Sequence, residues 1–208
     1  LIAGGGRGTF TPDSTNKKIE APIVYKSDNI EYNIPDEPTN LHTNAEIQHT
    51  DMNLSAGFLN INWQTNLLKA FPISPVDTTL KETRPTMKEA GKEPMSGDEM
   101  VYNLNTRRGK IIKGKTKTKD GYYHGNEIRN QADDTFYVKN SIYSTCDLDI
   151  PHFHFGEQKM KMIHNDKVVS RPLILYIGGI PLFPLPFAIF PHQSGNRNSG
   201  WLMPSYGE

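Results

Sequence analysis

Three histidines and one glutamate have the residue types of a metal site. The segment His152-x-His154-x-x-Glu157 places two histidines at alternate positions, and His192 follows later. Alternate residues of a strand share a face, so both imidazoles could bind one cation together with the Glu157 carboxylate. We nevertheless favour structural histidines at a strand end, and we predict neither a bound metal nor another cofactor.

Two alternatives involving catalysis can be weighed from these residues. The cupin jelly-roll enzymes use a similar histidine pattern with a longer spacing before the glutamate, which leaves a cupin-like metal-dependent enzyme as an alternative. Cys146 is the only cysteine, which excludes an internal disulfide and a zinc cluster of cysteines. A thiolate beside a histidine can act as a nucleophile, but no third catalytic member or oxyanion motif accompanies it. We therefore predict that the chain is not an enzyme.

Four lysines alternate with small residues in the middle of the chain, at Lys113, Lys115, Lys117 and Lys119. In a strand their ammonium groups share one face. A solvated face that protects a sheet edge is the preferred interpretation. Contact with anionic lipid headgroups or phosphates is the alternative.

The only long uncharged stretch runs from Pro172 to Pro191. Its length is that of a membrane helix, but interior prolines each cost a helix about 3 kcal/mol. We predict a buried strand over 173–177, a turn at Gly178 and Gly179, and an extended segment punctuated by prolines.

Period-two alternation dominates the rest of the chain from Ile19 onward, with turn residues at spacings near ten. This pattern predicts short antiparallel strands in an all-β fold. Lys+Arg and Asp+Glu balance at 23 each, so the composition carries no global signature of a nucleic-acid-binding protein. The apolar fraction of 36% is low for a closed core and suits half-exposed sheets.

A weak internal repeat and two breaks in composition suggest how the chain is divided. Residues 28–33 are echoed by residues 98–103, and residues 51–59 by residues 120–128, which predicts stacked strand layers. We predict a flexible lead-in over 1–18, a β domain over 19–195 with a long exposed loop over 72–97, and a separate final segment over 196–208.

Four motifs in the second half resemble a known family. They are the segments MVYNLNT (100–106), STCD (144–147), LYIGGIPLFPLPFAIFP (175–191) and SGWLMPS (199–205). Together they resemble the OstA-like, LptD-type lipopolysaccharide-assembly proteins of Gram-negative outer membranes. The likeness is dense from Met100 to Ser205 and weaker, through the repeat, over 21–66.

The resemblance implies a specific architecture. It implies an open β jelly roll, or β-taco, in which two antiparallel sheets meet in a V and hold lipopolysaccharide acyl chains in the apolar groove between them. It also implies that 196–208 begin a truncated outer-membrane β-barrel, and that Cys146 matches a family cysteine that forms a disulfide with that barrel. The segment at the junction with the barrel would contain Pro181, Phe183, Pro186, Phe187, Pro191, Gly200 and Pro204.

The resemblance also implies partners and a location. These are lipopolysaccharide, a periplasmic bridge protein of similar β fold, an outer-membrane plug lipoprotein, and the periplasmic side of the outer membrane, with no nucleic acid. From alternation we predict that the groove is lined by Phe136, Val138, Ile142, Phe153, Phe155, Met160, Met162, Leu173 and Leu175. A stand-alone bridge protein of the same β type, or a β domain that binds no lipid, are the remaining alternatives.

Overall fold

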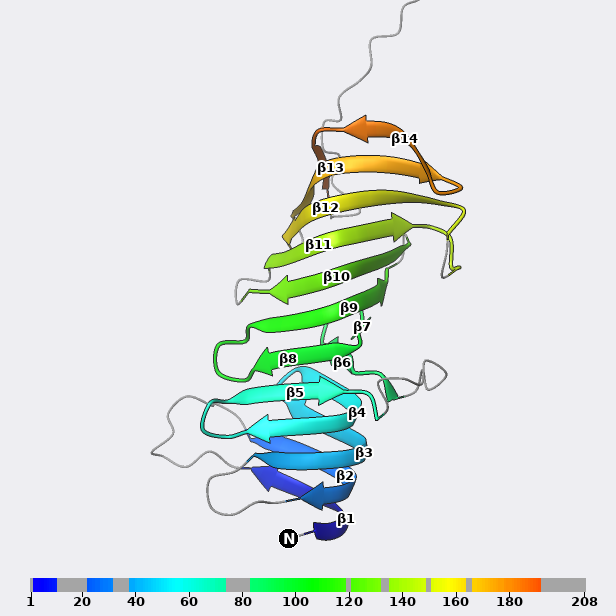
Figure 1. Ribbon diagram of the computed structural model, residues 1–208. Helices are drawn as coiled ribbons and strands as arrows, with labels where there is room; N and C mark the ends of the chain where they lie inside the picture. The colour runs from blue at the N-terminus through cyan, green and yellow to red at the C-terminus, as the bar shows by residue number, and fades with distance from the viewer. Residues whose placement is uncertain are drawn as a thin grey trace, which may run out of the picture.

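The computed structural model describes residues 2–10, 22–31, 38–73, 83–118, 121–131, 135–148, 151–163 and 166–191. Every strand in these ranges joins one sheet (Figure 1). The strands are β1 (Ile2–Phe10), β2 (Ile23–Glu31), β3 (Thr39–His49), β4 (Met52–Asn62), β5 (Leu67–Phe71), β6 (Thr86–Glu89), β7 (Met95–Ser96), β8 (Glu99–Asn103), β9 (Gly109–Lys117), β10 (Tyr122–Asn130), β11 (Thr135–Ser144), β12 (Phe153–Ile163), β13 (Lys167–Ile177), β14 (Ile180–Leu185) and β15 (Ala188–Pro191).

The sheet is antiparallel and follows the chain almost in order. Its main path is β1-β2-β3-β4-β5-β8-β9-β10-β11-β12-β13-β14, while β6, β7 and β15 lie off this path. In Figure 1 the strands form a stack that rises from β1 near the N-terminus to β14. The predicted all-β class, an open jelly roll of stacked antiparallel strands, is confirmed.

A line of interruptions crosses the sheet from strand to strand. Around β10 the pairing with both neighbours passes over Asn126. Lys113 and Asn140, which lie beside it, have positive φ angles of 48° and 49°. Pairing in β12 and β13 passes over Gln158 and Pro172 in the same way. Because a skipped residue shifts the alternation by one, each long strand changes direction at this line.

The line divides the sheet into two walls. On one side, the first wall, β6 pairs with residues 52–55 of β4, β7 with residues 115–116 of β9, and β14 with residues 173–177 of β13. On the other side, the second wall, β5 pairs with residues 58–62 of β4, β8 with residues 109–112 of β9, and β15 with residues 167–170 of β13. Each long strand therefore contributes to both walls.

The inner faces of the two walls pack on each other beside the line. A Cβ added to Gly125 of the first wall would lie 2.4 Å from Cγ1 of Val138 in the second. At Gly114 it would lie 2.4 Å from Cδ1 of Ile128. Glycine therefore leaves the space that β-branched side chains of the opposite wall fill.

The predicted flexible lead-in over 1–18 is wrong where the structure describes it. Residues 2–10 form β1, which pairs with β2 along its length. Backbone pairing needs no side chains, and at Gly8 a Cβ would lie 2.4 Å from the Tyr25 ring, so glycine makes room for that ring. Phe10 then stacks on Trp63 with ring centroids 4.3 Å apart.

The predicted loop over 72–97 is also wrong in its second half, whereas residues 74–82 lie outside the described part. Thr86–Glu89 and Met95–Ser96 form β6 and β7, which join β4 to β9 in the first wall. Strands of four and two residues are too short to show a period of two. The prolines, charges and small residues of this segment therefore led to the prediction of a loop. The predicted turn at Gly178 and Gly179 is confirmed, with φ angles of 57° and 80°.

Candidate functional site

The inner face of the sheet is the apolar surface on which the predicted groove residues fall. Phe136, Val138, Met160 and Leu173 point inward and are only 3–4% exposed. Register places Val138 and Met160 in one row with Ile128 and Ile111. Phe136 lies in a neighbouring row with Met162, and Leu173 in another with Glu157. Phe155, Met162 and Leu175 share this face and are half-buried, and Phe153 at the edge is 37% exposed. That these residues contact lipid stays a prediction.

Ile142 is the exception, because it lies on the outer face. Its register partners are His124 on β10 and Gly156 on β12. The positive φ of Asn140 shifts the alternation by one residue, so Val138 and Tyr143 point inward while Ile142 points outward. Uniform alternation from Phe136 could not reveal this shift.

Tyr143 and its neighbours form an aromatic row that the sequence prediction missed. The Tyr143 ring lies 4.6 Å from the Tyr123 ring and 6.5 Å from the Phe155 ring, measured between centroids. Register extends this row to Leu175 on β13 and Phe183 on β14. The sequence does show two adjacent tyrosines, Tyr122 and Tyr123, directly after Gly121. Alternation alone did not tell which of the two faces inward.

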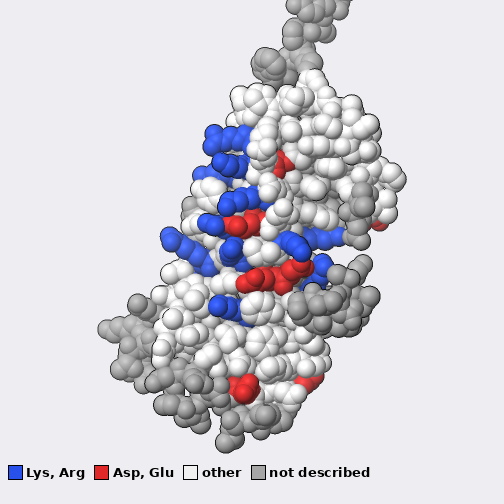
Figure 2. Space-filling model, in the orientation of Figure 1, with Lys and Arg blue, Asp and Glu red and all other residues white. Residues whose placement is uncertain are grey.

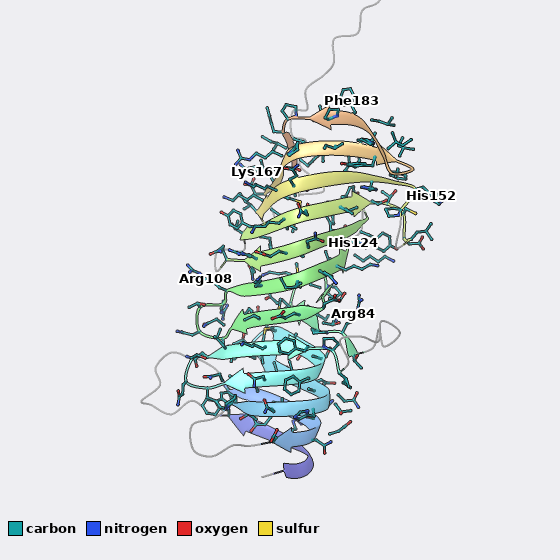
Figure 3. The ribbon with its side chains drawn as sticks, in the orientation of Figure 1. Arg84, Arg108, His124, His152, Lys167 and Phe183 are labelled. Carbon is teal, nitrogen blue, oxygen red and sulfur yellow. The ribbon has the colours of Figure 1, made fainter. Side chains whose placement is uncertain are left out.

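The inner face changes along the stack from closed to open. Toward the N-terminal end, Ile23, Leu41 and Leu59 are completely buried. At the other end, Ile177 is 50% exposed and Phe183 is 62% exposed. Figure 3 shows Phe183 on β14, the last strand of the main path. Apolar side chains at this end therefore keep surface available for a ligand.

Glu157 is a carboxylate buried within this apolar face. It is 7% exposed, and the Ser141 hydroxyl donates a hydrogen bond of 2.9 Å to its Oε2. Burial raises the pKa of Glu157 above its ordinary value, while the hydrogen bond from Ser141 opposes this rise. Glu157 and Ser141 thus form a buried polar site on a largely apolar surface.

The geometry does not favour the metal-site hypothesis. His154 stacks on Tyr176 of the outer face at 4.8 Å, whereas Glu157, three residues further, points inward. Burial lowers the pKa of His154, which favours a neutral ring. Among the described residues no three His, Cys, Asp or Glu side chains lie close enough to hold an ion, and His192 lies outside the described part.

Cys146 is a half-buried free thiol beside a histidine. Its Sγ lies 3.7 Å from Nδ1 of His152, and its backbone N–H donates to Oγ of Ser144 at 3.1 Å. His152 lies at the edge of the stack opposite Lys167 (Figure 3). The thiol is therefore accessible at the edge of the first wall.

The predicted junction segment lies on the last strands of the sheet. Pro181, Phe183, Pro186 and Phe187 are all exposed, and Pro191 ends β15. Gly200 and Pro204 lie outside the described residues. Within the described part of the chain, no helix has the length and apolar character needed to cross a membrane.

Comparison with known proteins gives consistent matches. A family model described as LptD protein matches residues 168–208. The LPS-assembly protein LptD of Azoarcus sp. (strain BH72) is 24% identical over 179 residues, which are 78% of this chain and 20% of that protein. The LPS-assembly protein LptD of Neisseria gonorrhoeae (strain ATCC 700825 / FA 1090) is 25% identical over 114 residues, 52% of this chain and 14% of that protein. The chain therefore spans a fifth or less of the length of these relatives.

A solved structure was also matched. LptH of Pseudomonas aeruginosa, described as the LptA-homologous periplasmic component of a lipopolysaccharide transport device, has a TM-score of 0.44 and 12% identity. The match covers 55% of this chain and 79% of that one. The sequence matches alone confirm the resemblance to LptD-type proteins.

Proposed function

Taking the chain as an LptD-like protein, we propose that it takes part in lipopolysaccharide transport and assembly at the outer membrane. In this proposal the inner face of the sheet binds acyl chains between the two walls and passes them toward a barrel. The chain makes and breaks no bond, so it acts as a conduit and not as an enzyme. It works on the periplasmic side of the outer membrane.

The observation that carries the proposal is the change of the inner face from closed to open. In the row that register aligns toward β14, the Tyr143, Phe155 and Leu175 side chains are half-buried and the Phe183 side chain is 62% exposed. Exposed apolar side chains in a row gain free energy by covering an acyl chain, at about 0.8 kcal/mol for each buried CH₂ group. A hydrocarbon chain is the ligand class whose length and chemistry fit such a row.

The two ends of the sheet suggest two protein partners. β1 ends the main path and pairs only with β2 among the described strands, so its other edge offers backbone groups for strand addition. We propose that a periplasmic bridge protein of similar β fold docks there. At the β14 end we propose continuation into a barrel with its plug lipoprotein, and we assign Cys146 to a disulfide with that barrel.

Adjacent residues on opposite faces of β13 allow a sharp test. Leu175 lies on the inner face in the row of Phe155 and Phe183, whereas Ile174 lies on the outer face beside Gly156. Both side chains are half-buried. The chain and its Leu175→Asp and Ile174→Asp variants would be purified from a Gram-negative periplasm and analysed by native mass spectrometry.

We expect a glycolipid-sized adduct on the unchanged chain that Leu175→Asp removes and Ile174→Asp retains. A carboxylate on the inner face would have to lose its hydration when an acyl chain binds, whereas one on the outer face stays in water. Tyr143→Asp and Ile142→Asp form a second matched pair on β11. Binding on the inner face would be excluded if both members of each pair lost the adduct equally. It would also be excluded if the adduct persisted in all four variants.

A further inference from the structure

The outer face of the second wall is strongly basic over β9 to β13. Two rows of side chains cross it, one from Ile112 to Arg171 and one from Lys110 to Val169. Six of these ten positions are basic and only Glu127 is acidic, a net charge of +5, although the whole chain is neutral. We call this surface the basic wall; its cations are Lys110, Arg129, Lys139, Lys159, Lys161 and Arg171.

Figure 2 shows blue side chains gathered on the left and across the middle of the molecule, with red ones among them. Glu127 pairs with Arg129 and, at 3.6 Å, with Lys139. Among the described residues, Lys159 and Arg171 have no acidic partner, although they lie directly opposite each other. Because like charges opposite each other destabilise a sheet, this arrangement needs an explanation other than folding.

The outer face of the first wall lacks this character over the same strands. Its corresponding row contains Lys115, His124, Ile142, Gly156 and Ile174. Lys115 is the one side chain of this row with a fixed charge, whereas the two rows of the second wall contain six cations on the same strands. The basic wall is therefore a local feature of one face and not a general means of keeping the sheet soluble.

Apolar side chains extend the basic wall at one end. The row that contains Lys161 continues through Val169 of β13 to Ile189 of β15, which is 60% exposed. Tyr137 in the same row is 44% exposed, and Nζ of Lys161 lies 5.5 Å from its ring centroid. Cations beside exposed aromatic and aliphatic side chains are the composition of surfaces that bind membranes.

We propose that the basic wall binds the surface of an anionic phospholipid bilayer. The lysines and arginines contact headgroup phosphates, while Ile189 and Phe187 at the β15 end enter the boundary of the acyl region. A flat strand surface with charges spaced by about 4.8 Å between neighbouring strands fits an extended plane of headgroups. This contact does not depend on the binding of acyl chains at the inner face.

The test compares two sets of four substitutions on opposite walls. The first set changes Lys139, Lys159, Lys161 and Arg171 to Gln. The control set changes Lys26, Lys88, Lys115 and Lys117 to Gln, all on the outer face of the first wall. Co-flotation with vesicles of phosphatidylglycerol and phosphatidylcholine, or of phosphatidylcholine alone, measures the bound fraction, and circular dichroism verifies the fold of each variant.

We expect the unchanged chain to bind the anionic vesicles and not the neutral ones. Removing the four cations of the basic wall should weaken binding by about tenfold or more, whereas the control set should bind nearly as the unchanged chain does. Salt at about 0.5 M should release the protein. Equal weakening by the two sets overturns the proposal. Failure to bind anionic vesicles also overturns the proposal and would instead indicate an acidic protein as the partner of the basic wall.

Discussion

The two ends of the sheet share one topology and differ in how they fill the space between the walls. At the end formed by β2 to β5, apolar side chains of both walls meet and exclude solvent, as Leu41 and Ile61 show by their complete burial. At the end formed by β12 to β15, the same inward rows contain larger side chains that remain exposed, such as Phe183 and Phe190. Packing stability therefore comes mainly from the closed end, whereas the open end carries the exposed apolar surface on which we propose that a ligand binds.

The difference shows why a chain with few apolar residues can both fold and keep an open apolar surface. The closed end contains aliphatic residues that bury fully, and each contributes about 1.5–3 kcal/mol. The open end contains similar apolar side chains, which stay partly exposed. A continuous hydrogen-bonded ladder joins the ends, so the closed end can support the open one.

The largest expected effect comes from replacing one leucine by alanine at each end of the sheet and comparing the losses of stability. Leu41→Ala removes a completely buried side chain and should lower the free energy of unfolding by about 2–5 kcal/mol. Leu175→Ala, on the open inner face, should lower it by about 1 kcal/mol or less. Urea unfolding monitored by circular dichroism measures both, and equal losses would show that the open end is packed as tightly as the closed one.

A smaller effect is expected from filling space with one methyl group. Gly125→Ala would place Cβ against Val138, a buried β-branched side chain that cannot move aside, and should cost about 1–3 kcal/mol. Gly156→Ala meets one edge of the Tyr176 ring, 2.7 Å from Cε2, and this half-buried side chain on the outer face can shift toward solvent. Thermal unfolding of both variants tests this contrast; a larger loss at Gly156 would mean that Tyr176 is fixed by packing.

The sequence predicted what depends on local alternation. Period two indicated the strands, and the glycine pair indicated the turn before β14. It also placed eight of the nine predicted groove residues on the inner face, because those residues lie within unbroken stretches of a strand. The motifs of the second half led to the LptD-type resemblance, which the matches to known proteins confirm.

The line of interruptions that divides the sheet into two walls could not be predicted, because it depends on how neighbouring strands pair. Asn140 and Lys113 adopt positive φ although neither is glycine, and only the register of β9 to β13 shows that they lie on one line. This is why Ile142 was assigned to the wrong face and Tyr143 was missed. β1 and β6 were missed because their stability comes from pairing with β2 and β4 and not from their own side chains.

The smallest expected effect concerns Glu157, which lies where the inner face begins to open. Its pKa in the folded chain is raised, mainly because burial disfavours the charged carboxylate. The carboxyl group therefore contributes fully to stability below the ordinary pKa of a glutamate, and this contribution is lost as pH rises through the raised folded pKa.

Glu157→Gln keeps the shape and a hydrogen-bonding partner for Ser141 but cannot ionise, so it should be more stable than the unchanged chain at neutral pH. The difference should shrink as pH falls through the raised folded pKa toward the ordinary pKa of a glutamate, which urea unfolding at a series of pH values measures. A difference that stays constant with pH would mean that the Glu157 carboxylate is hydrated in the folded chain, and hence that the open end reaches further toward β11 than its burial indicates.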